Sequence, residues 1–279
     1  MLDLLQHWQL VTRPFEATWD TRFFFRSTSH QEALDRLAYV VQEGGMNIGM
    51  LTGEIGCGKT LTRAVLQASL PAQEHHVIAL ENSGFAFEDL LAALLRRLGP
   101  QGLEIPPSQL ARLDLLETLL IKQAQEGRQV VVMLDEAQDM SMQTLHELRW
   151  LTNLNGAGQN LITILLIGQP NLRPMVQSCT DVDQRVGLRY HLQPLSLEVL
   201  PEYLAHRLHV AGHPHGLLFD ASAIAQLHEL TRGVPRTVNR LAKLALEYGW
   251  TKDAHQITGS HVNAVAQDIA LHQAVPLAA

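Results

Sequence analysis

Between an apolar run and a helical pattern, the chain reads Gly53-Glu54-Ile55-Gly56-Cys57-Gly58-Lys59-Thr60, which is the motif G-x-x-x-x-G-K-T. Glycines let successive backbone N–H groups turn toward one anion, and the start of the following helix adds the positive end of its dipole. Lys59 would reach the β- and γ-phosphates of a nucleotide, and the Thr60 hydroxyl would bind Mg²⁺. Since strand precedes and helix follows, the motif predicts a nucleoside triphosphate site rather than a chance glycine-rich turn. The residues predicted to hold the triphosphate here are Gly53, Glu54, Ile55, Gly56, Cys57, Gly58, Lys59, Thr60 and Leu61.

The composition describes a chain that can bury a large core. Of its 279 residues 46% are hydrophobic and 18% are charged, which suits one large domain with a smaller one, or two domains. The formal charge of -7 argues against a surface coated in positive charge, although a local basic face stays possible. With two cysteines, no secretory leader pattern and no apolar run of membrane length, we expect a cytoplasmic protein.

Strand and helix patterns alternate along the first two thirds of the chain. Strands are predicted at 47–52, 76–81, 130–134 and 161–167, with a short fifth at 189–192, and helices at 29–43, 61–70, 87–98, 109–125 and 142–153. Such alternation predicts an α/β fold, a parallel sheet with helices on both faces. After about residue 195 only helices follow, at 197–211, 221–230, 235–248 and 259–272. We therefore expect a nucleotide-binding domain over 1–195, including an N-terminal segment and helix over 1–45, and a small helical domain over 196–279.

The third predicted strand ends in Asp135-Glu136, directly after five apolar residues. Asp135 could hold Mg²⁺ together with Thr60, and Glu136 could accept a proton from an attacking water or orient that water. The alternative is that Asp135 caps the next helix and Glu136 is a solvated charge. Behind an intact phosphate loop, the catalytic interpretation is favoured.

Three further polar residues could act on the γ-phosphate. Gln169 follows the fourth strand, where ligands of parallel sheets gather, although it could be a plain loop residue. Arg185 could reach the γ-phosphate of a neighbouring subunit, with Arg189 as second choice, and each could instead be a surface arginine in an ion pair. Arg236, in Gly233-Val234-Pro235-Arg236, projects from a helix start and could reach the triphosphate, unless it is merely solvated.

These pieces, in this order, resemble an AAA+ ATPase. The resemblance makes 53–60 the Walker A loop, 130–136 Walker B, Gln169 sensor 1, Arg185 the arginine finger, and 233–236 the sensor 2 signature that starts a lid helix. More narrowly, the chain is similar to the bacterial ExeA-type ATPases, through Pro14-Phe15, Asp20-x-Arg22-Phe23-Phe24 and Ser29-His30-x-Glu32-Ala33-Leu34. That family is related to the TnsC, TniB and MuB transposition regulators. The resemblance implies a P-loop fold of the ASCE type, ATP and Mg²⁺ as ligands, and a homo-oligomer, ring or filament.

Two biological roles follow from the resemblance, and the sequence does not separate them. The first is an ATP-driven switch assembling on duplex DNA, working with a transposase, for which Arg96-Arg97, Arg207 and Arg232 could line a basic face. The second is an ATPase acting on protein partners in secretion or pilus assembly. A third reading is a nucleotide-dependent scaffold with little turnover. Long ExeA-type proteins carry a membrane span and a cell-wall-binding domain beyond the ATPase, which this sequence lacks, unless it is a fragment.

The cysteine and histidine residues give two smaller expectations. Cys57 stands where threonine or serine is commoner, and since that position contributes backbone, nucleotide binding should survive, although oxidation of Cys57 could block it. The histidine pairs His75-His76 and His213-Pro214-His215 lack a second half at metal-ligand spacing. Mg²⁺, bound by Thr60 and Asp135, is therefore the only metal we expect.

Overall fold

The computed structural model describes residues 3–16, 20–43, 46–81, 84–156, 159–214 and 216–273. The chain divides into two compact units. We call residues 29–54 and 59–192 the sheet unit, and residues 1–28, 55–58 and 193–279 the helical unit. Residues 55–58, the middle of the glycine-rich loop, therefore group with the C-terminal helices.

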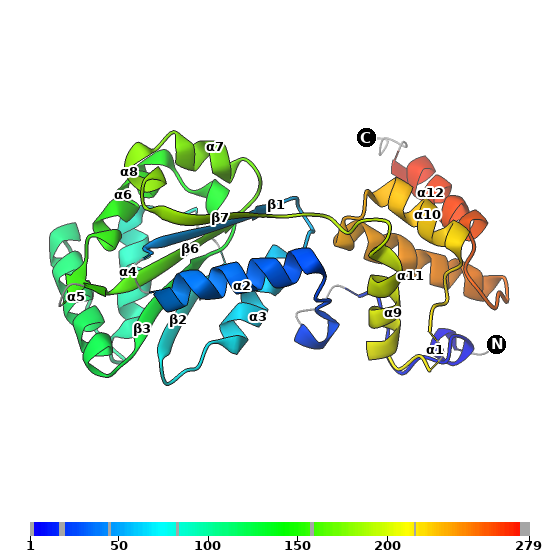
Figure 1. The fold of residues 1–279 in the computed structure, drawn as a ribbon, viewed down its shortest axis with the longest axis horizontal. Coiled ribbons are helices and arrows are strands. Elements are labelled where there is room, and N and C mark those ends of the chain that lie inside the picture. The colour runs from blue at the N-terminus through cyan, green and yellow to red at the C-terminus, as the bar shows by residue number, and fades with distance from the viewer. Residues whose placement is uncertain are drawn as a thin grey trace, which may run out of the picture. The chain divides into compact units, whose positions relative to one another are not determined.

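The sheet unit contains five parallel strands in the order β2-β3-β6-β1-β7 (Figure 1). Their bounds are β1 Ile48–Gly53, β2 His75–Leu80, β3 Gln129–Leu134, β6 Ile162–Gly168 and β7 Val186–Leu192. A short hairpin precedes β6, and its two antiparallel strands have two residues each, β4 Asn155–Gly156 and β5 Gln159–Asn160. The helices are α2 Thr28–Glu43, α3 Lys59–Ser69, α4 Phe87–Leu98, α5 Gln109–Gln125, α6 Met142–Thr152, α7 Leu172–Gln177 and α8 Thr180–Asp183, with a 3₁₀ turn, η2, at Ala137–Asp139.

Helices cover both faces of the sheet, as the apolar strands require. Alternate residues of a strand face opposite sides, and Ile48 and Met50 of β1 share one core with apolar side chains of α4 to α8. On the other face, a Cβ added at Gly49 would lie 3.2 Å from Val40 of α2. Figure 1 shows α2 and α3 on the same side of the strands. Every residue of β1 and β6 is buried, which explains why these strands are mostly apolar.

The predicted elements of this unit are confirmed, but one strand is longer than predicted, and two short helices and one hairpin were not predicted. The strand predicted at 189–192 begins at Val186 and pairs along β1 as a full edge strand. Its residues between Val186 and Leu192 are only partly buried or exposed, so its sequence carries a weak strand signal. Helices α7 and α8 and the β4–β5 hairpin were not predicted, because each is too short to show a period.

The helical unit contains α1 Leu4–His7, a 3₁₀ turn, η1, at Thr21–Phe23, and the helices α9 Leu200–Val210, α10 Ala221–Thr231, α11 Pro235–Thr251 and α12 Gly259–Gln273. The four C-terminal helices confirm the prediction. Asp220 caps α10 by accepting the Ala223 N–H at 2.8 Å, and Pro235 occupies the first turn of α11. Within the described ranges, every helix is too short or too polar to cross a lipid bilayer.

The N-terminal segment packs in the helical unit, which differs from the prediction that grouped residues 1–45 with the sheet. Trp8, Phe15 and Phe23 are buried in the core of the helical unit, and the Trp8 indole donates to the Leu246 carbonyl oxygen at 3.1 Å. Aromatic side chains bury a large apolar area, so the segment packs against the core in which its aromatic side chains are buried. Spacing alone could not reveal this, since the segment has no regular period.

The same packing contradicts the prediction that Arg207 lies on an exposed basic face. Arg207 is 4% exposed, donates to the Pro14 and Glu16 carbonyl oxygens at 2.6 and 3.0 Å, and lies over the Phe23 ring at 4.7 Å. A guanidinium that satisfies backbone oxygens inside a core holds the N-terminal segment in place. Arg207 therefore cannot belong to an exposed basic face, whereas Arg96, Arg97 and Arg232 are exposed.

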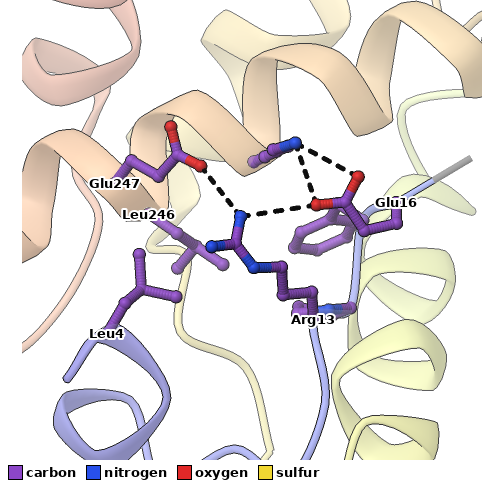
Figure 2. A pocket seen from close by; sticks show the side chains of 8 residues that line it. Leu4, Arg13, Glu16, Leu246 and Glu247 are labelled. Carbon is purple, nitrogen blue, oxygen red and sulfur yellow. Dashed lines mark hydrogen bonds and ion pairs between the residues drawn. The ribbon is translucent and has the colours of Figure 1, made fainter.

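A small pocket lies beside the same segment (Figure 2). Figure 2 shows Arg13 between the carboxylates of Glu16 and Glu247, with N–O distances of 3.5 and 3.4 Å. Lys243 of α11 completes the group at 2.8 Å from Glu16, and this ion pair lowers the pKa of the Glu16 carboxyl. Two cations and two anions neutralise each other here, so the group fastens the segment to α11.

Gly233 gives a stability prediction for this unit. Its φ is +72°, and an added Cβ would lie 1.8 Å from the Leu195 carbonyl oxygen. Gly233→Ala should therefore lower the free energy of unfolding by the left-handed strain, roughly 1–2 kcal/mol, plus an overpacking cost of roughly 1–3 kcal/mol. The matched control is Gly216→Ala, where φ is +66° and no atom lies within 4 Å, so only strain applies. Thermal unfolding of both variants checks this, and equal shifts in Tm would contradict it.

Candidate functional site

The loop 53–60 joins β1 to α3, as the motif predicts. Gly56 and Gly58 adopt φ values of +88° and +98°, which side chains strongly disfavour. The Lys59 ammonium is buried and donates to the carbonyl oxygens of Gly53 and Glu54 at 2.8 and 3.1 Å. A cation is thus held at the mouth of the loop, where it would meet the β- and γ-phosphates.

Gly53 is required by the sheet rather than by a ligand. A Cβ added at this position would lie 2.9 Å from the Leu192 carbonyl oxygen of β7. The edge strand therefore approaches the end of β1 closely, and only glycine leaves room for it. This fixes where the loop leaves the sheet.

Asp135 follows β3 and is 2% exposed. Thr60, the other predicted Mg²⁺ ligand, is close enough to Asp135 for its hydroxyl to lower the pKa of this carboxyl. Burial raises the pKa of Asp135, while the Glu136 N–H and the Arg63 guanidinium oppose that rise. A hydroxyl and a carboxylate side by side are the donors that Mg²⁺ takes from a protein when phosphates and water complete its octahedron. The residues present therefore fit the ion.

Arg63 is a site residue that sequence reasoning missed. It lies on α3, is 4% exposed, and places its Nε 3.3 Å from Asp135 Oδ2 and its Nη2 3.4 Å from Glu81 Oε1. A buried arginine must be paired, and here the partner is the predicted metal ligand. One signal was available: Arg63 follows Lys59 by four residues, so it lies on the same face of α3.

Glu136 has left-handed backbone angles, φ 50° and ψ 41°. A residue other than glycine in that region stores strain of roughly 1–2 kcal/mol, and such residues cluster at functional sites. The Glu136 carboxylate accepts a hydrogen bond from Gln138 Nε2 at 2.9 Å. Glu136 occupies the N-cap position of η2, but its side chain forms no capping hydrogen bond there.

Gln169 lies directly after β6, at the same edge of the sheet as Asp135 and Glu136. Its backbone N–H donates to Gln138 Oε1 at 2.9 Å, so the end of β6 is joined to the turn that follows β3. The structure thus brings Lys59, Thr60, Asp135, Glu136 and Gln169 to the carboxyl ends of β1, β3 and β6, the edge where parallel sheets bind ligands.

The two arginines before and within β7 differ in their partners. Arg189 forms an ion pair with Asp183, 2.7 Å between Nη2 and Oδ1. Arg185 donates to the Asp181 carbonyl oxygen at 2.6 Å and to Asn153 Oδ1 at 3.0 Å, and within the described ranges no carboxylate pairs with it. A guanidinium whose charge is not neutralised is the better candidate for contact with a phosphate, so Arg185 is favoured over Arg189.

Arg236 lies in the helical unit, next to the part of the loop that groups with it. Its backbone N–H donates to the Gly56 carbonyl oxygen at 3.2 Å, and a Cβ on Gly56 would lie 2.6 Å from the Arg236 Cβ. The start of α11 therefore packs directly on Gly56, in the part of the loop that belongs to the helical unit. Arg236 is exposed, and in the described part of the chain its side chain forms no ion pair.

The structure also bears on the remaining predictions for this region. Cys57 is fully buried, so peroxide has no direct access to its thiol, which weakens the expectation that oxidation blocks the loop. Within the part of the chain that the structure describes, no three histidine, cysteine or acidic side chains group as a metal site. His213 Nδ1 instead donates to the Trp8 carbonyl oxygen at 3.0 Å, and His215 lies outside the described residues.

The parallel sheet, the phosphate loop and the acidic pair after β3 define a P-loop protein with the AAA+ fold. A family model described as AAA domain matches residues 42–176. The chain is 33% identical over 270 residues to general secretion pathway protein A of Aeromonas hydrophila, which covers 95% of this chain and 48% of that protein. The chain thus spans about half the length of that relative. The chain is therefore similar to an AAA domain over residues 42–176 and to that secretion pathway protein over nearly its whole length.

Solved structures agree on the fold. Cdc6p from Pyrobaculum aerophilum superposes with a TM-score of 0.65 at 15% identity, covering 95% of this chain and 74% of that one. The ORC2 protein of Aeropyrum pernix, in complexes with ADPNP and ADP, gives 0.60 at 17% identity, covering 92% and 75%. The RuvB Holliday junction branch migration motor of Thermotoga maritima gives 0.58 at 15% identity, covering 92% and 73%.

Proposed function

We propose that this protein binds and hydrolyses ATP at the edge of the sheet where β1, β3 and β6 end. The observation that carries the proposal is the acidic pair after β3, where the Asp135 carboxylate accepts the Glu136 N–H at 3.0 Å, at the same edge of the sheet as the buried Lys59 ammonium. Water would form a bond to the γ-phosphorus while the bond to the bridging oxygen breaks, giving ADP and phosphate. The proton of that water would pass to the Glu136 carboxylate.

The other predicted residues take supporting roles in this proposal. The backbone of the loop from Gly53 to Gly58, with Leu61 at the start of α3, cradles the phosphates, and Lys59 neutralises their charge. Mg²⁺, held by Thr60 and Asp135, would draw negative charge from the phosphate oxygens when bound. The Gln169 amide would contact the γ-phosphate, and Arg236 would respond to it from the start of α11.

We further propose that ATP lies at the interface between identical copies, in a ring or a filament. Arg185 would then reach the γ-phosphate held by the neighbouring copy. Its uncompensated charge supports this role, because a guanidinium without a carboxylate partner is free to pair with a phosphate. Such an arrangement makes assembly depend on nucleotide, and hydrolysis would loosen it.

Arg185→Ala should lower the ATPase rate by roughly 10³-fold, because a finger arginine stabilises transition-state charge. The matched control is Arg189→Ala, which removes an arginine already paired with Asp183 and should change the rate little. Activity should return when Arg185→Ala protein is mixed with Lys59→Ala protein. In that mixture one copy supplies an intact loop and the other supplies the arginine.

The mixing experiment shows whether Arg185 acts on the nucleotide of its own copy or on that of a neighbouring copy. Recovery supports a finger acting across an interface, while two single variants that stay inactive together would place Arg185 in its own site or in a structural role. Sedimentation with and without Mg·ATP tests assembly directly. A protein that stays monomeric at saturating nucleotide would contradict the oligomer proposal.

Two partner classes remain as proposals. The relative named general secretion pathway protein A favours a switch that acts on protein partners of a secretion or pilus apparatus. The solved structures with DNA, such as the Aeropyrum pernix ORC1 protein in complex with DNA, have the same fold but carry no partner over at 18% identity. The other role is a switch on duplex DNA that works with a transposase, as in the TnsC, TniB and MuB regulators. For this role one arginine of the candidate basic face is excluded, because Arg207 is buried and cannot contact DNA.

Binding to labelled duplex DNA separates these roles. A DNA switch should bind without sequence preference, only with ATP, and much more weakly at about 200 mM than at about 50 mM salt. A flat response to both salt and ATP would end that version. Stimulation of the ATPase by membrane vesicles carrying secretion proteins would support the protein-partner role, and fractionation of cells would test the predicted cytoplasmic location.

A further inference from the structure

We propose that Gln138 is the positioning residue of the site: its side-chain amide holds the Glu136 carboxylate and ties it to the end of β6. The inference rests on the proposed function, because it concerns the residue to which we assign proton transfer. Gln138 lies in η2, two residues after Glu136, and it was not among the residues predicted from the sequence.

The two ends of the Gln138 amide have different partners. Nε2 donates to Glu136 Oε2 at 2.9 Å and, more weakly, to Asp139 Oδ1 at 3.3 Å. Oε1 accepts the backbone N–H of Gln169 at 2.9 Å. A backbone N–H can only donate and an ionised carboxylate can only accept, so the partners fix which end is oxygen.

The side chains nearest to glutamine in shape do not meet both demands. Glutamate could still accept from Gln169 but would present a second negative charge to Glu136, and methionine could do neither. Asparagine is one methylene shorter. The site therefore needs a residue with an acceptor at one end and a donor at the other, at the length of glutamine.

Gly168 makes room for this bridge. A Cβ added at Gly168 would lie 2.6 Å from Gln138 Oε1 and 3.3 Å from the Gln138 backbone nitrogen. The last residue of β6 must therefore be glycine to leave space for the Gln138 amide. Any shift of the β6 end, for instance when Gln169 meets a phosphate, would pass through Gln138 to Glu136.

The bridge also accounts for the strained backbone of Glu136. A left-handed residue persists only when its surroundings determine it, and here the Asp135 carboxylate holds the Glu136 N–H at 3.0 Å while Gln138 holds its side chain. Both ends of Glu136 are therefore fixed before any substrate arrives. Fixing a reacting group in advance is what gives orientation its catalytic value.

The test compares Gln138→Glu and Gln138→Met with the parent. We expect kcat to fall roughly 10- to 100-fold, since a misplacement of about 1 Å costs on that order, while the Kd for a fluorescent ADP analogue stays within about twofold. Gly168→Ala should lower kcat in the same direction by displacing the amide. The matched controls are Gln143→Glu and Gln143→Met, because Gln143 also donates to a carboxylate, Glu147 at 2.8 Å, on the exposed side of α6.

A double variant shows whether Gln138 acts through Glu136. In a Glu136→Gln background, Gln138→Met should cause no further loss of turnover, because the group it positions is already gone. A further loss of tenfold or more would overturn the inference. So would Gln138 variants with the parent's kcat, or variants whose nucleotide affinity falls as much as their kcat.

Failure of the inference can be told from failure of the proposed function. If Glu136→Gln alone keeps the parent's turnover, Glu136 does not take the proton and the proposed function fails. If Glu136→Gln is inactive while both Gln138 variants turn over normally, only the role of Gln138 is refuted. Should Gln138→Met fold poorly, Gln138→Glu, which has the same shape, gives the same decision.

Discussion

Lys59→Ala should weaken binding of Mg·ATP by roughly 30- to 3,000-fold, which is the cost of removing one partner from a desolvated charge pair. The Lys59 ammonium is 5% exposed and is held by the carbonyl oxygens of Gly53 and Glu54. Phosphate oxygens entering the loop would meet this charge in a site with little water, where it counts most. Titration with a fluorescent ATP analogue measures the effect.

Two further variants make the Lys59 result specific. Lys122→Ala removes an exposed lysine from α5 in the same unit and should leave the Kd unchanged. Lys59→Arg keeps the charge but replaces a compact ammonium by a planar fork, so it should restore affinity only in part. If Lys59→Ala bound nucleotide as tightly as the parent, the loop would not be the phosphate site. ATP-dependent assembly should disappear together with binding.

Glu136→Gln should lower turnover by roughly 10²- to 10⁴-fold, the range that a positioned general base contributes. Binding of ATP should stay near the parent's value, because the amide keeps the shape of the side chain and removes only the proton acceptor. Assemblies that form with ATP should therefore persist, since the step that loosens them no longer occurs. Single-turnover hydrolysis and sedimentation with ATP measure the two effects.

The matched control for this variant is Glu147→Gln on α6, another carboxylate that accepts a glutamine amide. It should hydrolyse ATP at the parent's rate. A Glu136→Gln protein with unchanged function, and with no longer-lived assemblies, would favour the nucleotide-dependent scaffold over either ATPase role. A variant that lost binding and turnover together would show that Glu136 supports the site rather than accepting the proton.

The sequence predicted the site where the residues lie close along the chain. Lys59 and Thr60 follow the glycines, and Asp135 and Glu136 end a strand, so local order fixes their chemistry. The residues predicted from the sequence did not include Gln138 and Arg63, whose importance comes from partners at Gln169 and Asp135, 31 and 72 residues away. A glutamine or an arginine on a helical turn looks the same whether it is solvated or bridges two loops.

The sequence pattern by itself determined a parallel sheet, a phosphate loop and four C-terminal helices, because backbone sterics and apolar periodicity act over a few residues. Tertiary packing alone decided that residues 3–16 and 20–28 join the helical unit and that β7 extends back to Val186. It also decided that, among the described residues, a carboxylate pairs with Arg189 but none pairs with Arg185. Each of these depends on surfaces contributed by segments far apart in sequence, where burial and pairing are settled by which groups meet.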